Sequence, residues 1–292
     1  MYRLGGMGPG GATVIAKRSR RAKALTERTV YMEVLPRLDV LAVPYYGFVD
    51  DDEDADFAWL FVGDAGEEPY SPALSEHRTL AARWLGLLHT SATSSPPTAR
   101  LSDRGPDFYR EHLRSACTRL LRHLGNPALT RDDVPILEAV VGQCETLGSR
   151  WGRVEQLCQA LPRTLVHGDF APKNLRVRAS SSGPVLLPFD WGSAGWGVPA
   201  ADLTQTWAPS DPWNTWAGPD LDVYRATVRR AWPHVSLGDL AALAALGKAF
   251  RCLYSVDVEA EYLGEPWVEK AMRNMAFYQA AIADALLEVG WG

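Results

Sequence analysis

The chain has 292 residues, with 30 lysines and arginines against 35 aspartates and glutamates, and a formal net charge of −5. Hydrophobic residues make up 47% and charged residues 22%, a globular composition that excludes wholesale disorder. The acidic balance argues against a nucleic-acid-binding protein, which needs a basic surface, and no apolar run is long enough to span a membrane. The four scattered cysteines and the absence of a signal-peptide pattern predict a cytoplasmic protein.

The first third of the chain is predicted to be rich in β-structure. Short β-branched or aromatic runs bounded by turn residues predict four strands, at Tyr2–Leu4 and at residues 12–17, 43–49 and 57–62. Between the second and third strands, apolar residues at helical spacing predict a helix over residues 20–35, which ends at Pro36.

The rest of the chain is predicted to be mainly helical. Apolar residues recur at helical spacing over residues 75–91, 106–124, 132–161, 220–232, 237–263 and 266–289. Residues 164–190 are strand-like and interrupt this pattern. We therefore expect an α+β fold with two lobes, in which residues 1–64 form a small β-rich N-lobe and residues 65–292 a larger helical C-lobe.

The strongest chemical signal is the segment His167-Gly168-Asp169, followed by Asn174 and by Asp190 at the end of an apolar strand. Phosphoryl transfer to a hydroxyl needs a carboxylate that orients the hydroxyl and accepts its proton, and oxygen ligands that hold Mg²⁺ on the phosphates. An aspartate on a tight loop can do the first. One asparagine and one aspartate suit Mg²⁺, which keeps phosphate oxygens and waters as its other ligands.

A second signal is a lysine at the end of an apolar strand. Val14-Ile15-Ala16-Lys17 precedes a predicted helix that carries Glu27 and Glu33. In kinases a strand lysine binds the α- and β-phosphates and is held by a helix glutamate. Taken alone, Lys17 fits a solvated strand end equally well, and the downstream motif favours the functional reading.

Together the segments VIAK, LVHGDFAPKN and PFDWG and the helix glutamate resemble the aminoglycoside phosphotransferase/choline kinase-like family. The resemblance extends from Lys17 to the region of Asp202. It implies a bilobal protein-kinase-like fold that uses ATP and Mg²⁺ to phosphorylate a hydroxyl of a small molecule. The glycine in His-Gly-Asp and the short interval between Asp190 and Asp202 disfavour a protein kinase.

The resemblance also implies roles for the motif residues. Asp169 would be the catalytic base, His167 would support its loop, and Lys173 would contact the γ-phosphate from within the loop. Asn174 and Asp190 would be the Mg²⁺ ligands.

On the nucleotide side, the resemblance implies that Lys17 binds the phosphates. We expect Glu27 to be its partner, with Glu33 as the alternative. Gly63 and Ala65 lie where the family's hinge recognises adenine through backbone groups. The resemblance further implies a structural His89 and an Asp202 that steadies the catalytic loop or caps a helix.

The glycine-rich residues 5–11 depart from the family pattern. Gly11 is only six residues from Lys17, which at about 3.3 Å per residue leaves room for one short strand. We therefore expect a hairpin turn at the far end of that strand, and not the loop that covers the phosphates. The family's first strand and phosphate loop would then lie before Met1 or be absent, with a more open adenine pocket and weaker ATP binding.

The acceptor is expected to be a hydroxylated small molecule, with cationic antibiotics and amino alcohols as candidates. The residues considered for its pocket are tryptophans and acids late in the chain: Trp196, Trp207, Trp213, Trp216, Asp211, Asp220, Asp222, Asp257 and Glu261. Core packing of the tryptophans and solvation of the acids remain the alternatives. A catalytically weak, pseudokinase-like binding protein is the alternative function, and either a monomer or a homodimer is expected.

Overall fold

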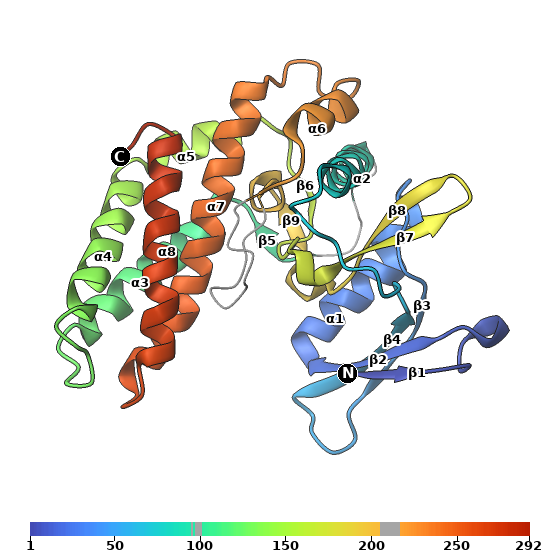
Figure 1. Cartoon of the computed structure of the whole chain (residues 1–292), viewed down its shortest axis with the longest axis horizontal. Helices are drawn as coiled ribbons and strands as arrows, with labels where there is room; N and C mark the ends of the chain where they lie inside the picture. Colours follow the sequence, from blue (N-terminus) through green and yellow to red (C-terminus); the bar gives the residue numbers. More distant parts are fainter. Residues whose placement is uncertain (95, 97–100, 205–216) are drawn as a thin grey trace.

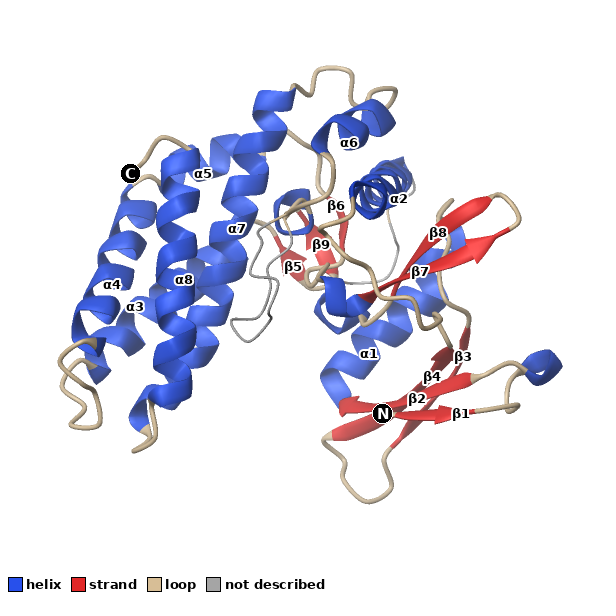
Figure 2. Cartoon of the chain, in the orientation of Figure 1, coloured by secondary structure: helices blue, strands red, loops and turns tan. Residues whose placement is uncertain are grey.

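The structure is a computed structural model, and it describes residues 1–94, 96, 101–204 and 217–292. A four-stranded sheet lies at one end of the molecule and a bundle of long helices at the other, with short strands between them (Figures 1 and 2). This is the α+β, bilobal arrangement predicted from the sequence.

The first sheet is antiparallel, and its strands have the order β1-β2-β4-β3. Their bounds are β1 (Tyr2–Leu4), β2 (Val14–Arg20), β3 (Tyr45–Asp50) and β4 (Phe57–Gly63). All four strands were predicted, and β2 continues three residues beyond its predicted end. Its register places Lys17 opposite Leu60 of β4, so the lysine lies in the middle of the sheet and not at a frayed strand end.

The helix predicted over residues 20–35 is regular for only part of that length. Helix α1 (Arg21–Thr29) continues as a π-helical turn (Val30–Val34) and a 3₁₀ turn (Leu35–Arg37). The Leu35 N–H donates to Val30 O, which closes the π-helical turn. Pro36 lies in the 3₁₀ turn, and because proline has no N–H it cannot continue the α-helical hydrogen bonds. The predicted end is therefore a tightening of the helix before Leu38.

Residues 5–11 join β1 to β2. They precede Val14, the first residue of β2, which pairs with Gly63 at the end of β4. Lys17 is three residues later in β2, so it lies away from this turn. The turn points away from the helical bundle in Figure 1. It therefore connects two neighbouring strands at the end of β4, which is the position expected from its spacing to Lys17.

Seven helices make up most of the rest of the described chain. Their bounds are α2 (Ser75–Ser94), α3 (Pro106–His123), α4 (Asp133–Ser149), α5 (Trp151–Cys158), α6 (Leu221–Val228), α7 (Leu237–Glu259) and α8 (Glu269–Glu288). Helix α7 packs against α3, α6 and α8 and buries Leu243, Phe250 and Leu253 completely. It is the central element of this half, and none of the described helices is long and apolar enough to cross a membrane.

Two predicted helices are shorter than expected. The segment predicted as residues 132–161 is two helices, which meet at Arg150 between Gly148 and Gly152. Glycine is a poor helix former, and the apolar spacing alone did not reveal the break. Helix α7 ends at Glu259 and continues as a 3₁₀ helix (Ala260–Gly264).

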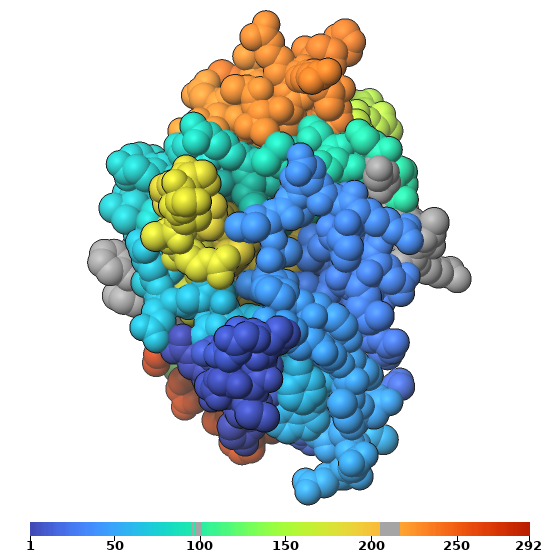
Figure 3. Space-filling view, turned by 90° about the vertical axis from the view of Figure 1, so that its right-hand side faces the viewer, coloured from blue at the N-terminus to red at the C-terminus, as the bar shows by residue number. Residues whose placement is uncertain are grey.

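The strand-like segment contains β6 (Thr164–Val166), β7 (Leu175–Ser180) and β8 (Gly183–Pro188). The N–H of Val177 in β7 donates to Glu68 O at 3.0 Å. In Figure 3 the β7–β8 hairpin (yellow) lies on the surface beside the segment that leads into α2 (blue to teal). The connector after β4 is thus paired with β7, the strand that follows residues 167–174.

Two very short strands were not predicted. They are β5 (Asp103–Arg104) and β9 (Gly195–Gly197), and they form a three-stranded sheet with β6 in the order β5-β9-β6. A Cβ at Gly197 would lie 2.1 Å from Arg104 O, so the two backbones approach as closely as glycine allows. Strands of two and three residues show no alternation that a sequence pattern could detect.

Gly247 sets the distance between α7 and the 3₁₀ helix Pro199–Asp202, since a Cβ there would lie 1.9 Å from Ala200 O. Gly247→Ala is therefore expected to lower the free energy of unfolding by about 1–3 kcal/mol, the usual effect of overpacking. Urea unfolding followed by circular dichroism measures this. The matched control is Gly142→Ala, in α4 with nothing within 4 Å of the added Cβ, which should be neutral or stabilising by up to about 1 kcal/mol. Equal effects at the two positions would contradict the close approach.

Candidate active site

Asp202 anchors the loop that follows β6. Its Oδ2 accepts a hydrogen bond from His167 N at 2.6 Å, and its Oδ1 accepts one from Gly168 N at 2.9 Å. Burial of the Asp202 carboxyl raises its pKa, but the contact with His89 at 3.6 Å and the hydrogen bond from the His167 amide outweigh burial, so the pKa lies below its usual value. The ionised Asp202 thus fixes two backbone amides immediately before Asp169, and His89 is held behind it by the Tyr224 hydroxyl at 2.8 Å.

His167 is fully buried and lies behind the loop. Its Nε2 donates to Phe189 O at 3.0 Å, and its Nδ1 accepts from Asp169 N at 3.3 Å. Burial lowers the pKa of His167, which favours the neutral ring that this pattern requires. The ring lies tilted against Trp191, with centroids 4.5 Å apart. His167 therefore connects the loop to the end of β8, next to Asp190, and it does not line the cavity described below.

Gly168 has a φ of 74°, in the left-handed region. A Cβ at this position would lie 2.3 Å from Ser193 O. Both the backbone conformation and the space therefore require glycine between His167 and Asp169.

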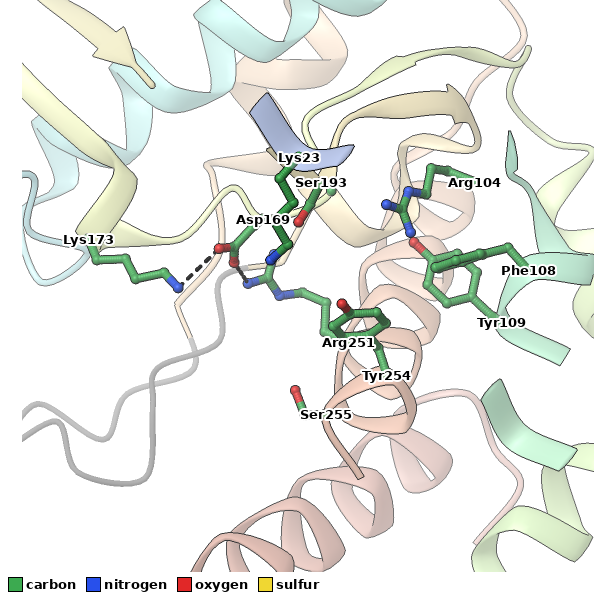
Figure 4. A pocket seen from close by; sticks show the side chains of 11 residues that line it. Lys23, Arg104, Phe108, Tyr109, Asp169, Lys173, Ser193, Arg251, Tyr254 and Ser255 are labelled. Carbon is green, nitrogen blue, oxygen red and sulfur yellow. Dashed lines mark hydrogen bonds and ion pairs between the residues drawn. The ribbon is translucent and has the colours of Figure 1, made fainter. Parts of the chain in front are cut away.

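Asp169 accepts hydrogen bonds on both carboxylate oxygens. Arg251 Nη2 donates to Oδ1 at 2.8 Å, Asn174 Nδ2 donates to Oδ2 at 2.9 Å, and Lys173 Nζ lies 3.0 Å from Oδ2 (Figure 4). Burial raises the pKa of Asp169, but the charges of Arg251 and Lys173 outweigh burial, so the pKa lies below its usual value. A carboxylate has about four lone-pair sites, so these three contacts leave room for one further donor.

Lys17 makes two ion pairs across the interface between β2, α1 and the end of β8. Its Nζ lies 2.5 Å from Glu27 Oε1 and 2.7 Å from Asp190 Oδ1. Glu27 is almost completely buried, and burial raises its pKa to about 7 against the opposing effect of Lys17. Glu33 is exposed in the π-helical turn, so the structure places Glu27 and not Glu33 against the lysine.

Asp190 has a φ of 66° and a ψ of 62° and is, within the described ranges, the one non-glycine residue with a positive φ. Asparagine and aspartate tolerate this conformation better than most residues. Asn174, which is buried, uses its amide nitrogen to donate to Asp169 O and Oδ2, both at 2.9 Å. The loop therefore occupies the amide nitrogen of Asn174 and not its oxygen.

Gly63 and Ala65 lie at the end of β4, away from the catalytic loop. The Gly63 N–H donates to Pro44 O at 2.7 Å, so the fold itself uses this amide and it is not available to a ligand. Asp64, between them, accepts from Gly66 N at 2.9 Å through its side chain. Only the Gly63 carbonyl and the backbone of Ala65 are left for the adenine contact expected from the sequence.

A cavity of about 250 Å³ opens next to Asp169 (Figure 4). Its walls come from the start of α1, from β5 and α3, from the catalytic loop and from α7. The residues that line it are Lys23, Arg104, Phe108, Tyr109, Gly168, Asp169, Lys173, Ser193, Arg251, Tyr254 and Ser255.

Most of these lining residues were not found from the sequence. Arg104 ends β5 and Phe108 lies in the first turn of α3, while Arg251, Tyr254 and Ser255 share one face of α7. That spacing was readable in the sequence. Nothing in it indicated that the two helices face each other across Asp169.

The acidic residues considered for the acceptor do not line this cavity where the structure describes them, namely Asp220, Asp222, Asp257 and Glu261. Asp220 caps α6 by accepting from Val223 N at 3.0 Å, and Asp257 lies 2.7 Å from His112 Nδ1. Glu261 pairs with Arg119 at 2.7 Å. Trp196 is in β9, and Trp207, Asp211, Trp213 and Trp216 lie outside the described residues.

Comparison with known proteins gives one family match and many structural matches. Residues 1–246 match the model of a family described as "Phosphotransferase enzyme family". No curated protein sequence matches.

Three solved structures illustrate the structural likeness. A choline kinase from Cryptosporidium parvum has a TM-score of 0.57 at 11% identity, over 96% of this chain and 84% of that one. A Plasmodium vivax ethanolamine kinase has a TM-score of 0.54 at 14% identity, over 94% and 75%. A spectinomycin phosphotransferase, solved with ADP and spectinomycin, has a TM-score of 0.54 at 10% identity, over 96% and 87%. At these identities the likeness is one of fold.

Proposed function

The chain belongs to the phosphotransferase enzyme family, and from that premise we propose that it transfers the γ-phosphate of ATP to a hydroxyl group of a small molecule. The observation that carries this proposal is the position of Asp169. Its ionised carboxylate borders a cavity, while the loop that holds it also carries Asn174 and is tied through His167 to the strand end before Asp190.

On the nucleotide side, we assign the phosphates to Lys17 and the nucleotide-binding lobe to residues 1–64. Glu27 holds the ammonium group of Lys17 in place, which fixes a positive charge beside Asp190. The adenine would lie against the end of β4 at Gly63 and Ala65. Residues 65–292 would then form the acceptor side.

Asn174 and Asp190 fit Mg²⁺ as a donor set. The amide nitrogen of Asn174 is turned toward Asp169, which leaves its oxygen as a ligand, and Asp190 contributes a carboxylate that is 41% exposed. One amide and one carboxylate suit an ion that takes its remaining ligands from phosphates and water. When bound, Mg²⁺ would neutralise charge on the β- and γ-phosphates.

The roles of the loop side chains follow from their contacts. Asp169, with one lone-pair site left, would orient the acceptor hydroxyl and take its proton. Its low pKa suits an orienting role in a transition state that is largely dissociative, where the proton moves late. Lys173 is 70% exposed, so it can turn from Asp169 toward the γ-phosphate.

The four free cysteines support a cytoplasmic location.

The test is ADP formation from ATP with hydroxylated small molecules. We expect ADP release that needs both an acceptor and Mg²⁺, and that stops when EDTA removes the metal. Calorimetry should show ATP binding that strengthens with Mg²⁺. Binding of an acceptor without any ADP formation would instead support the pseudokinase-like alternative.

A further inference from the structure

The cavity beside Asp169 is lined mainly by positive charge. Four of its lining side chains are cationic, namely Lys23, Arg104, Lys173 and Arg251, whereas Asp169 is the one carboxylate among the lining residues that the structure describes. Lys173 and Arg251 both contact Asp169. The other two cations have no such compensation within the wall of the cavity.

Arg104 is the most constrained of these cations. It is half-buried, and its guanidinium stacks over the Phe108 ring at 4.2 Å from the centroid. The stem of its side chain packs against Gly195 and its backbone against Gly197. In the part of the chain that the structure describes, no carboxylate lies within ion-pair distance of it, and its buried Nε has no hydrogen-bond partner. A half-buried guanidinium whose charge no described carboxylate neutralises is unfavourable, and it is a preformed site for a carboxylate or phosphate.

Figure 4 shows Arg104 across the cavity from Asp169, with its guanidinium directed inward. Lys23 reaches the same space from α1, where its side chain lies against Gly192. Phe108, Tyr109 and Tyr254 provide aromatic surface between the two sides. A ligand with a hydroxyl at one end and an anionic group at the other matches this arrangement of charges.

On the basis of the proposed phosphotransferase function, we propose that the acceptor is a small hydroxylated anion, whose carboxylate or phosphate binds Arg104 while its hydroxyl meets Asp169. In the reaction the acceptor oxygen forms a bond to the γ-phosphorus as the bond to the β,γ-bridging oxygen breaks. The hydroxyl proton passes to Asp169 and ADP leaves.

The same observations disfavour a cationic acceptor. An amino group in this cavity would lie among four positive side chains. Three of the acids predicted to hold it, Asp220, Asp257 and Glu261, bond elsewhere to Val223, His112 and Arg119. The volume of about 250 Å³ lies below the range of roughly 300–1,000 Å³ usual for drug-sized ligands. A hydroxy acid, sugar acid or sugar phosphate is small enough.

The experiment compares acceptors that share a skeleton and differ in charge. Gluconate, glucose 6-phosphate, glucose and glucosamine form one set, and glycerate, glycerol and 3-amino-1,2-propanediol form another. ADP release with Mg-ATP gives kcat and KM for each. We expect the anionic members to exceed the neutral ones by about tenfold or more in kcat/KM and the amino compounds to be used least. Gluconate against glucose 6-phosphate distinguishes a carboxylate from a phosphate.

Arg104→Gln should raise KM for the anionic acceptors by about 10- to 100-fold, as expected for a hydrogen bond to a charged group. It should change kcat little and leave neutral acceptors unaffected. Arg104→Lys, which keeps the charge and loses the planar fork, should fall between the two. Arg114→Gln, on the exposed face of the neighbouring helix α3, is the matched control and should behave as wild type.

Two results would overturn this inference while leaving the proposed function intact. One is ADP formation that is as fast or faster with the neutral or amino members. The other is an unchanged KM for anionic acceptors in Arg104→Gln. Absence of ADP formation with every acceptor would instead contradict the proposed function, and the inference would fall with it.

Discussion

Replacing Asp169 by asparagine is expected to lower kcat by about 100-fold or more, the usual contribution of a general base, while the affinity for Mg-ATP changes little. Asparagine keeps the size of the side chain and an oxygen that Arg251 can reach, so the loop should stay in place. It cannot take the proton of the acceptor hydroxyl. Steady-state ADP release measures kcat, and calorimetry measures the affinity for Mg-ATP.

The matched control for this variant is Asp52→Asn, in the exposed turn between β3 and β4, which should behave as wild type. The pH dependence provides a second check. The pKa of Asp169 lies below its usual value, and an ordinary aspartate is already ionised above about pH 5, so its own titration should not alter the rate between pH 5 and 8. Wild-type turnover in Asp169→Asn would rule out its assigned role.

Replacing Asp190 by asparagine is expected to abolish Mg²⁺-dependent ATP binding and turnover together. The change removes the negative charge that faces Lys17 at 2.7 Å and that we assign to the metal. We expect the affinity for Mg-ATP to fall by about 100-fold, which corresponds to about 3 kcal/mol. Calorimetric titration of ATP with and without Mg²⁺ separates the metal-dependent part from the rest.

Asparagine is the sharper substitution at this position because it tolerates the left-handed backbone of Asp190 (φ 66°). Asp190→Ala should lose the same binding and, in addition, about 1–2 kcal/mol of folding free energy. Comparing the two variants in urea unfolding isolates this backbone effect. An asparagine variant that binds Mg-ATP as tightly as wild type would show that Asp190 is not a metal ligand.

The sequence predicted those parts of the site that lie close together along the chain. Asp169 and Asn174 share one loop, and Lys17 and Glu27 are separated by a single strand end and a helix turn. The sequence separation within each pair therefore predicts that the two side chains lie close together. The regular strands and long helices were predicted for the same reason, since each repeats an apolar period that burial requires.

The cavity beside Asp169 was not predicted because its residues come together only through packing between distant elements. Arg251 reaches Asp169 from 82 residues away, and Arg104 is placed by two glycines of β9 that are more than 90 residues later. Neither arginine belongs to a local motif. The sequence pattern therefore favoured acids and tryptophans late in the chain. Of these, Asp220, Asp257 and Glu261 bond elsewhere.

Gly168 limits which sequences can evolve at this loop. Protein kinases have arginine where this chain has glycine, in their His-Arg-Asp motif. Here any side chain at position 168 would collide with the Ser193 carbonyl and would have to adopt a positive φ. A single-codon change to arginine would thus disrupt the loop before the new charge could be of use. The two motifs differ by one letter, yet a viable path between them requires the segment around Ser193 to move first.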